Sequence, residues 1–260
     1  MIKIFCVDIG NSSIDSGIYS RGKILLRRKF PLEDLKGFIV FAKRIVSKSE
    51  IGNISISAVV PAAGLELRKA LAAYTGRIYF INPSKIKTIK INDKYKKQAG
   101  ADRIANAAAA SGRYKAPSLV VDFGTAITFD VIKKTNHYDG SIIFPGLRTS
   151  KNALVSSAVL LPDFRFARPG SVIADNTPDA MRAGLYYGTA ELVKGIKRRI
   201  EKELNIRFKT VIGTGGDAGI FERENVFDII DNDLTLFGAA ILMIDENIYG
   251  KKRQRHIKDI

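Results

Sequence analysis

The sequence predicts an α/β fold in which one unit of strands and helices occurs twice. Residues 7–12 (VDIGNS) and residues 121–126 (VDFGTA) are similar and lie 114 residues apart. Each segment begins three short apolar runs separated by turn residues, a pattern typical of a three-stranded meander, and each meander leads into helical sequence. A repeat of this length is too long for a solenoid unit. We therefore expect two related α/β domains, residues 1–116 and 117–250, followed by a basic tail at residues 251–260.

In the first half, turn residues separate apolar runs of strand length. The sequence GNSS at residues 10–13 and the pair Arg21-Gly22 divide the opening into three runs, and Pro61 ends a later one. The longer stretches read as helices, and the last of these is rich in alanine, a strong helix former. In chain order we expect strands at residues 2–9, 14–19, 23–30, 53–60 and 78–81, and helices at residues 32–47, 64–74 and 102–111.

The second half repeats the pattern and ends in helical sequence. Gly124-Thr125 and Asn136 divide its first three runs. The tail after Gly250 is basic and has no apolar period, so we expect a frayed end. The expected strands lie at residues 120–123, 126–132, 138–144 and 210–212, and the expected helices at residues 147–160, 178–204 and 235–245.

The chain of 260 residues has a net charge of +16. Such a charge attracts polyanions, which include ATP, nucleic acid and anionic membrane surfaces. Apart from clusters at residues 85–97 and 251–258, however, the basic residues are scattered. We therefore favour charge spread over solvated faces and do not expect a nucleic-acid partner.

Cysteine content and hydrophobicity indicate the compartment. The single cysteine, Cys6, excludes an intramolecular disulfide and favours a reducing environment. Asp8 interrupts the apolar stretch at the N-terminus, so we expect no signal peptide. Later apolar runs are far shorter than the roughly 20 residues that cross a bilayer. We expect a cytoplasmic protein with no membrane partner.

Asp8 and Asp122 each end a predicted strand, and a glycine follows two residues later. Such a turn suits phosphate, because glycine permits close backbone approach, N–H groups and hydroxyls hold phosphate oxygens, and the carboxylate holds hydrated Mg²⁺. A single copy is also an ordinary β-turn. Two copies at equivalent places in related halves favour a nucleotide triphosphate held from both sides, in a cleft between the domains.

Residues 213–216 (GTGG) follow the predicted strand at residues 210–212 and match the start of a dinucleotide-binding fingerprint. That fingerprint needs a βαβ unit, and no partner strand is evident beyond Phe227. We favour a turn on which adenosine lies against the backbone; an ordinary turn between a strand and a helix is the alternative. The sequence contains neither Gly-Lys-Ser nor Gly-Lys-Thr, which excludes a P-loop kinase.

Residues 100–103 (GADR) open the alanine-rich helix. An acid at a helix start is often only a cap. Asp102 could instead accept the proton of an attacking hydroxyl, and Arg103 could bind an anionic substrate group through a bidentate pair. Spacing alone leaves both interpretations open.

Together these segments resemble the type III pantothenate kinase family. Each match is modest by itself, but the ordered set runs nearly from end to end of the chain. The matching segments are DIGNS at residues 8–12, SAVVP at 57–61, GADR at 100–103, DFGTA at 122–126, FPGL at 144–147, LP at 161–162, NT at 176–177, AM at 180–181, TGG at 214–216 and LTL at 234–236.

The resemblance implies a fold and a reaction. The fold is a pair of ribonuclease H-like domains of the actin, Hsp70 and hexokinase ATPase type. The reaction is ATP-dependent phosphorylation of the primary hydroxyl of pantothenate, the first step of coenzyme A synthesis. The resemblance also implies a homodimer that requires Mg²⁺ and a monovalent cation, either K⁺ or NH₄⁺.

The resemblance further implies roles for single residues. Asp102 is the general base, and Asp122 binds the monovalent cation. Asp8 also lies in the metal site, close to Mg²⁺. ATP is bound by Asp8, Gly10, Asn11, Ser12, Gly124, Thr125, Gly215 and Gly216. The substrate pocket is formed by Gly100, Ala101, Arg103 and Thr177.

Two positions depart from the family pattern. The family has a tyrosine seven residues before the glycine of its Gly-x-Asp-Arg motif and a proline three residues later, where this chain has Asp93 and Lys96. Tyr95 lies nearby, and we expect it to contact substrate in place of that tyrosine. Phe237 follows the Leu-Thr-Leu motif where the family has an acid, a change that we expect to leave the chemistry intact.

Two other functions stay open. A non-catalytic nucleic-acid-binding regulator on the same fold would use the basic clusters and would bind with a steep salt dependence. The intact Asp8, Asp102 and Asp122 argue against it, because each carboxylate would repel phosphate. A kinase for another small hydroxylated acceptor, such as a sugar, is the second alternative, and the changed segment around Asp93 motivates it.

Overall fold

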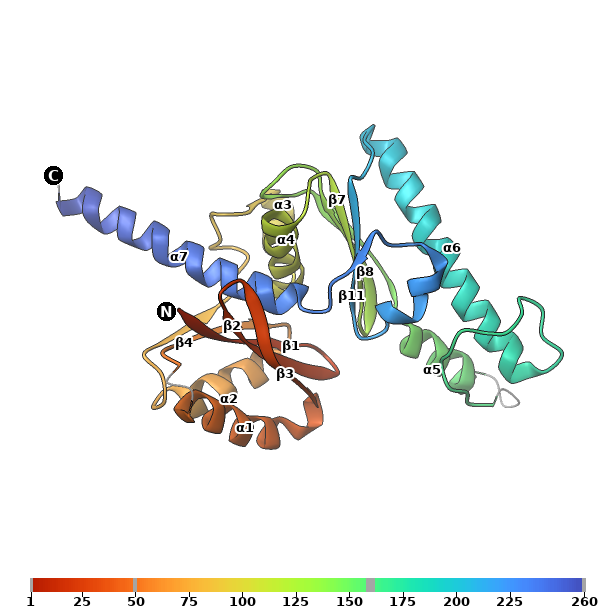
Figure 1. Cartoon of the computed structure of the whole chain (residues 1–260), viewed down its shortest axis with the longest axis horizontal. Helices are drawn as coiled ribbons and strands as arrows, with labels where there is room; N and C mark the ends of the chain where they lie inside the picture. The colour runs from red at the N-terminus through yellow and green to blue at the C-terminus, as the bar shows by residue number, and fades with distance from the viewer. Residues whose placement is uncertain (1, 49–50, 158–161, 259–260) are drawn as a thin grey trace. The chain divides into compact units, whose positions relative to one another are not determined.

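A computed structural model describes residues 2–48, 51–157 and 162–258 of the chain (Figure 1). The chain divides into two compact units. The first unit consists of Met1–Tyr114, Asn136–Asp139 and Asp233–Ile260, and the second consists of Lys115–Thr135 and Gly140–Asn232. The last segment of the chain therefore folds with the first unit.

The first unit contains a five-stranded sheet in the order β3-β2-β1-β4-β5. β1 pairs antiparallel with β2 and parallel with β4, so it lies in the middle of the sheet. A central strand of this kind is buried on both faces, which explains the nearly continuous apolar run that predicted it. The strands are β1 (Lys3–Ile9), β2 (Ser13–Ser20), β3 (Lys23–Pro31), β4 (Asn53–Ala58) and β5 (Arg77–Phe80).

The second unit contains a five-stranded sheet with the same arrangement, in the order β10-β8-β7-β11-β12. β7 takes the place of β1, since it pairs antiparallel with β8 and parallel with β11. The predicted duplication of the α/β unit is therefore confirmed. The strands are β7 (Ser118–Phe123), β8 (Ala126–Ile132), β10 (Gly140–Pro145), β11 (Thr210–Gly215) and β12 (Ile229–Ile230).

Two helices cover one face of the first sheet. A 3₁₀ turn, η1 (Leu32–Asp34), leads into α1 (Leu35–Lys48), and α2 (Pro61–Leu71) follows β4. Phe5 of β1 and Phe38 of α1 share one buried core on this face. The core extends across the central strands, where side chains alternate between the two faces of the sheet.

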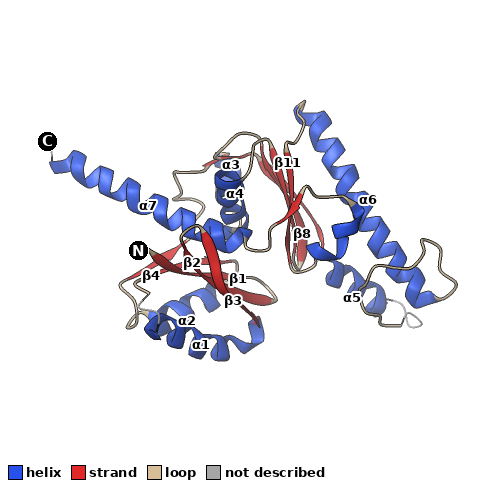
Figure 2. Cartoon of the chain, viewed as in Figure 1, coloured by secondary structure: helices blue, strands red, loops and turns tan. Residues whose placement is uncertain are grey.

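Two other helices belong to the same unit, α4 (Ala101–Arg113) and α7 (Leu234–Lys258). The hydroxyl of Ser55 in β4 donates a buried hydrogen bond of 2.6 Å to the carbonyl of Ala239 in α7. Because the neighbours of Ser55 in β4 point into the core of α1 and α2, this bond lies on the opposite face of the sheet. Helices therefore cover both faces (Figure 2).

Short elements connect β5 to α4. β6 (Lys90–Ile91) and α3 (Asp93–Lys96) precede α4, and β6 pairs in parallel with β9 (His137–Tyr138). The pairing explains why residues 136–139 belong to the first unit although the segments on both sides belong to the second. β6 and α3 were not expected from the sequence, and the strand expected at residues 138–144 is divided between β9 and β10.

Three helices complete the second unit: α5 (Leu147–Ser157), α6 (Thr177–Leu204) and the 3₁₀ helix η2 (Ala218–Glu224). Asn176 caps α6, because its side-chain oxygen accepts a hydrogen bond of 3.0 Å from the Asp179 N–H. A buried core of aromatic and branched aliphatic side chains joins α6 and η2 to the sheet.

Most predicted elements form within a few residues of their expected bounds. The strand expected at residues 210–212 continues to Gly215, because a strand accepts glycine where another backbone approaches closely. α7 continues to Lys258, through residues that were expected to form a tail. The helix expected at residues 147–160 ends at Ser157, and the rest of that prediction lies outside the described residues.

In the described part of the chain, no helix combines the length and apolar character needed to cross a membrane.

Candidate active site

The first glycine turn joins β1 to β2 directly after Asp8. The Gly10 N–H donates a hydrogen bond of 2.9 Å to the Ser13 carbonyl, which closes the hairpin. Asn11 and Ser12 lie at the tip and are exposed. The turn therefore presents an amide, a hydroxyl and backbone N–H groups to solvent, beside a half-buried carboxylate.

Asp8 has neighbours on the same sheet face that were given no role from the sequence. Asp15 of β2 lies directly opposite it, and Ser57 of β4 lies directly beside it. Arg27 of β3 holds the Asp15 carboxylate, since its Nε lies 3.1 Å from each oxygen and its Nη2 forms a further hydrogen bond. Like charges placed opposite each other destabilise a sheet, so this arginine offsets the repulsion between the two acids.

The second glycine turn joins β7 to β8 directly after Asp122 and is one residue shorter. Its Gly124 N–H donates a hydrogen bond of 3.0 Å to the Ala126 carbonyl. The Thr125 carbonyl accepts two further hydrogen bonds, of 3.0 Å from the Gly146 N–H and 2.7 Å from the Thr149 hydroxyl. The Phe-Pro-Gly-Leu segment and the start of α5 thus support this turn from behind.

Gly215 lies against Asp122 in the second unit. Thr214 is the direct neighbour of Asp122 across β11 and β7 and is buried. Gly215 has a φ of +87°, and a Cβ there would lie 2.5 Å from Asp122 Oδ1. Only glycine fits this position without strain, because an L side chain rarely adopts this φ and has no room here. The exposed Gly216 follows.

β12 was not expected and bears on the dinucleotide-binding alternative. It pairs in parallel with β11, so the partner strand that the sequence did not reveal exists. The sheet nevertheless differs from a dinucleotide-binding sheet, because β8 and β10 run antiparallel and the connection from β11 to β12 is a 3₁₀ helix. The glycine turn after Thr214 is therefore part of the duplicated α/β unit and not of a dinucleotide-binding βαβ unit.

Asp102 lies in the first turn of α4 and is half-buried. Its Oδ1 accepts a hydrogen bond of 2.8 Å from the Arg103 N–H, so the carboxylate curls back over the helix start. A side chain on Gly100 would overlap this carboxylate. Asp102 is not the N-cap of α4, because that position is Gly100 and it makes no side-chain cap hydrogen bond.

Arg103 and Tyr95 lie together next to Asp102. Arg103 Nη1 donates to the Tyr95 hydroxyl, and Nη2 donates to the Gln98 carbonyl at 3.3 Å. The Tyr95 ring also stacks on Tyr138 of β9, with 5.7 Å between ring centroids. Asp93, which holds the family tyrosine's position, is exposed at the start of α3. Short elements that the sequence did not predict therefore bring Tyr95 to the helix that carries Asp102.

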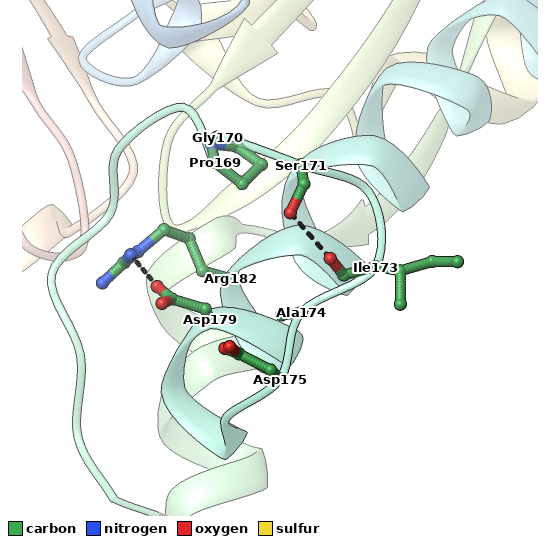
Figure 3. Close-up of a pocket in the computed structure, with 8 residues that line it drawn as sticks. All are labelled: Pro169, Gly170, Ser171, Ile173, Ala174, Asp175, Asp179 and Arg182. Carbon is green, nitrogen blue, oxygen red and sulfur yellow. Dashed lines mark hydrogen bonds and ion pairs between the residues drawn. The ribbon is translucent and has the colours of Figure 1, made fainter.

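Thr177 is the first residue of α6 and is exposed. A pocket of about 510 Å³ lies beside it, between the loop before α6 and the first turns of the helix (Figure 3). Asp179 and Arg182 form an ion pair at its wall, and the Ser171 hydroxyl donates to the Ile173 carbonyl at 2.6 Å. Thr177 itself does not line this pocket.

The predicted site residues divide between the two units. The first unit holds Asp8, Gly10, Asn11, Ser12, Tyr95, Gly100, Ala101, Asp102 and Arg103. The second unit holds Asp122, Gly124, Thr125, Thr177, Gly215 and Gly216. Sequence reasoning missed Asp15 and Ser57, which strand register places beside Asp8, and Arg27, which pairs with Asp15.

Comparison with known proteins identifies relatives along most of the chain. Residues 4–199 match the family model described as type III pantothenate kinase. A type III pantothenate kinase of Bacillus cytotoxicus is 36% identical over 250 residues, which cover 92% of this chain and 95% of that protein. Another, of Geotalea uraniireducens, is 38% identical over 250 residues, covering 92% and 97%.

Solved structures share the fold at lower identity. A Campylobacter jejuni protein described as a transcriptional activator of the Baf family has a TM-score of 0.59 and 21% identity, covering 94% of this chain and 98% of that one. Component A of the (R)-2-hydroxyglutaryl-CoA dehydratase of Acidaminococcus fermentans has a TM-score of 0.55 and 15% identity, covering 93% and 97%. Both show that this chain shares its fold with those proteins.

Proposed function

Because this chain belongs to the type III pantothenate kinase family, we propose that it transfers the γ-phosphoryl group of ATP to the primary hydroxyl of pantothenate. The product is 4'-phosphopantothenate, and the step is the first of coenzyme A biosynthesis. Family membership over nearly the whole chain is the observation that carries this assignment. The acids that the reaction needs, Asp8, Asp102 and Asp122, are all present.

The glycine turns of both units contact ATP in this proposal. The exposed Asn11 and Ser12 and the turn residue Thr125 suit phosphate oxygens. Gly10 and Gly124, whose N–H groups close the hairpins, let the phosphates approach the backbone closely. Phosphoryl transfer depends mainly on positioning and charge neutralisation, so two such turns make chemical sense. A second set of contacts, from Gly215 and Gly216, lets adenosine lie against backbone without a side chain between them.

Asp8 and Asp122 offer the carboxylate oxygens that Mg²⁺ and K⁺ or NH₄⁺ would need. The described residues contain no group of three or more His, Cys, Asp or Glu side chains able to hold a metal ion. A site with one or two carboxylates fits Mg²⁺, which usually keeps several waters and shares its coordination with substrate phosphates. When bound, these cations neutralise charge on the triphosphate. Asp8 takes Mg²⁺ in this proposal, and Asp122 takes the monovalent cation.

Asp102 accepts the proton of the attacking hydroxyl, and its neighbours hold pantothenate. The Arg103 guanidinium suits the carboxylate of pantothenate, because charged fork-shaped pairs are strong and directional. Gly100 and Ala101 line the substrate pocket at the start of α4, where Gly100 leaves room for the Asp102 carboxylate. The Tyr95 hydroxyl, in hydrogen-bond contact with Arg103, extends this surface. Thr177 provides a further contact to substrate.

The proposal includes a homodimer in the cytoplasm. The single cysteine is buried, and burial raises the pKa of its thiol well above the ordinary value, so it stays protonated and unreactive.

Sedimentation of the purified chain tests the dimer: a species of twice the 28.6 kDa chain mass is expected, and a monomer at all concentrations contradicts it.

Release of ADP by the purified protein tests the reaction. We expect release that requires pantothenate and rises on adding K⁺ or NH₄⁺ in place of Na⁺. Pantothenate-independent release, or release with a sugar but none with pantothenate, would contradict the proposed acceptor. A matched reaction with Asp102→Asn, assayed at the same protein concentration, controls for contaminating kinases.

A further inference from the structure

The Leu234-Thr235-Leu236 segment has no role in the proposed chemistry, yet it makes a specific contact. Both leucines are buried, and they flank the half-buried Thr235 at the start of α7. The Thr235 hydroxyl donates a hydrogen bond of 2.7 Å to Asn106 Oδ1 of α4. This contact joins the end of the chain to the helix that carries Asp102.

Asn106 lies one helical turn after Asp102. Residues four apart share a helix face, so Asn106 lies directly below the proposed base along α4. Asn106 is fully buried, at 0% exposure. A buried amide is held firmly in place by its hydrogen bonds, because leaving it unpaired is costly.

The backbones of α4 and α7 touch next to this hydrogen bond. A side chain on Gly238 would overlap the carbonyl of Ala105, so the two helices are in direct contact there (Figure 1). Close-packed helices have little freedom to slide past each other. The hydrogen bond then fixes which turn of α4 faces the start of α7.

A ring contact between the two helices lies farther from the site. The Arg113 guanidinium lies 4.4 Å from the centroid of the Phe237 ring, at the opposite end of α4 from Asp102. Asn106, which bonds to Thr235, is much closer to Asp102 in sequence than Arg113, which contacts Phe237. Phosphoryl transfer is sensitive to small errors in the position of a reacting group.

We propose that Thr235 and Asn106 are positioning residues for phosphoryl transfer: their hydrogen bond sets the place of the first turn of α4 and thereby of Asp102. This inference rests on the proposed function, in which Asp102 is the base. Thr235 touches neither ATP nor pantothenate and acts only through α4.

The test is Thr235→Val, which keeps the shape of the side chain and removes the hydroxyl. We expect kcat to fall about tenfold while KM for ATP and for pantothenate stays within about twofold, because a misplaced base affects the chemical step more than binding. Thr235→Ser keeps a hydroxyl and should restore kcat to within about threefold of wild type. Unchanged kcat in folded Thr235→Val overturns the inference.

A double variant shows whether the hydroxyl acts through the base. In an Asp102→Asn background, Thr235→Val should lower kcat no further, because residues that act as a unit are not additive. The same tenfold loss in both backgrounds would overturn the inference. Full activity of Asp102→Asn alone would instead be a failure of the proposed function, so the two failures are distinguishable.

Ser16→Ala serves as the matched control. It removes a buried hydroxyl that donates 3.2 Å to the Arg28 carbonyl, in the same unit but between β2 and β3. We expect a loss of thermal stability similar to that of Thr235→Val with kcat unchanged; an equal fall in kcat would show that lost stability alone explains the effect and would overturn the inference. If Thr235→Val yields no folded protein, Thr235→Ala, which places no methyl group against the amide, is measured in the same way.

Discussion

Asp8 and Asp122 occupy equivalent places in the two sheets but have different neighbours. Asp8 lies opposite a second acid, Asp15, whose charge is cancelled by Arg27. Asp122 lies opposite Thr128. In the first site Arg27 offsets the charge of Asp15, and it also lies 3.6 Å from Asp233. This balance suits a triphosphate, which an additional uncompensated acid would repel.

Replacing Arg27 disturbs this balance. In Arg27→Met the Asp15 carboxylate faces Asp8 without its partner, so we expect KM for ATP to rise about threefold to tenfold, since the pair is only partly screened by solvent. Adding Asp15→Asn removes the surplus charge and should restore KM. The exposed neighbour, in Arg28→Met, serves as the control. A KM that is the same in both arginine variants would contradict this account of Arg27.

At Gly215 both the backbone conformation and the lack of space exclude a side chain. In Gly215→Ala both the φ of +87° and the 2.5 Å approach to Asp122 Oδ1 oppose the new side chain. We expect the free energy of unfolding to fall by about 1–3 kcal/mol and KM for ATP to rise. Urea unfolding and steady-state kinetics measure both. Gly219→Ala, where a Cβ meets nothing within 4 Å, should change neither, and an equal effect there would contradict the explanation.

The sequence predicted the residues of the motifs but not the residues beside them. Asp8, Asp102 and Asp122 stand out because glycine turns or a helix start follow strand-like or alanine-rich runs. Asp15 and Arg27 have no such signal, and Ser57 begins the SAVVP segment but was given no role. Their place beside Asp8 depends on strand register, which is fixed by hairpin length and by the order of the strands.

At the level of elements, the two hairpins differ in length by one residue, and sequence comparison does not show this difference. Asp8 and Asp122 are 114 residues apart, but Ile14 and Ile127, which pair with the strand residues before each turn, are 113 apart. The second turn has therefore lost one residue. The similar letters continue through Ala126, so the sequence alone does not show where the shift occurs.

The sequence also placed the end of β11 too early, at residue 212, because glycines follow. The glycines after Ile212 read as a turn, but β11 continues to Gly215. The Phe227 ring leaves no room for a side chain at Gly213, and Asp122 and the Phe123 backbone leave none at Gly215. β12 has only two residues, too few for an apolar pattern to reveal it.

The link between α6 and η2 predicts a dependence of stability on pH. The Tyr186 hydroxyl donates to Glu224 Oε1 at 2.9 Å. Burial, followed by this hydrogen bond, raises the pKa of Tyr186 to about 12. Because an unfolded tyrosine has a pKa of about 10, the folded state holds its proton more tightly, and stability falls as pH rises from about 10 to about 12.

Tyr186→Phe should weaken this dependence. We expect the urea midpoint of the variant to fall less between pH 9 and pH 11.5 than that of wild type, because the titrating hydroxyl is gone. Tyr79, whose pKa burial also raises to about 12, still contributes in both proteins. The adjacent Tyr187→Phe is the control. An identical pH dependence in wild type and Tyr186→Phe would contradict the role given to this buried hydroxyl.

At the scale of the whole molecule, the return of α7 to the first unit is the feature that a simple duplication does not suggest. The helix follows the second sheet in sequence but packs on α4. A signal exists: the small residues of the segment 238–240 (GAA) match the alanine-rich face of α4, and small side chains let two helices touch. Sequence periodicity shows each helix, but not which helices pair.

Phe237, which departs from the family pattern, fits this packing. Its ring lies edge-on to Tyr19, with 5.6 Å between centroids, and under the Arg113 guanidinium. An acid at position 237 could form an ion pair with Arg113, whereas Phe237 contacts the same arginine through a cation–π interaction. The expectation that this change leaves the chemistry intact stays a prediction.

Asp102→Asn tests the central claim, that Asp102 takes the proton in pantothenate phosphorylation. Calorimetric titration with ATP and steady-state ADP release are measured on the same preparation. We expect ATP affinity close to wild type and a kcat lower by about 10²–10⁴-fold, the usual loss when a general base is removed. Turnover of Asp102→Asn within a fewfold of wild type, with pantothenate as the acceptor, would contradict the account.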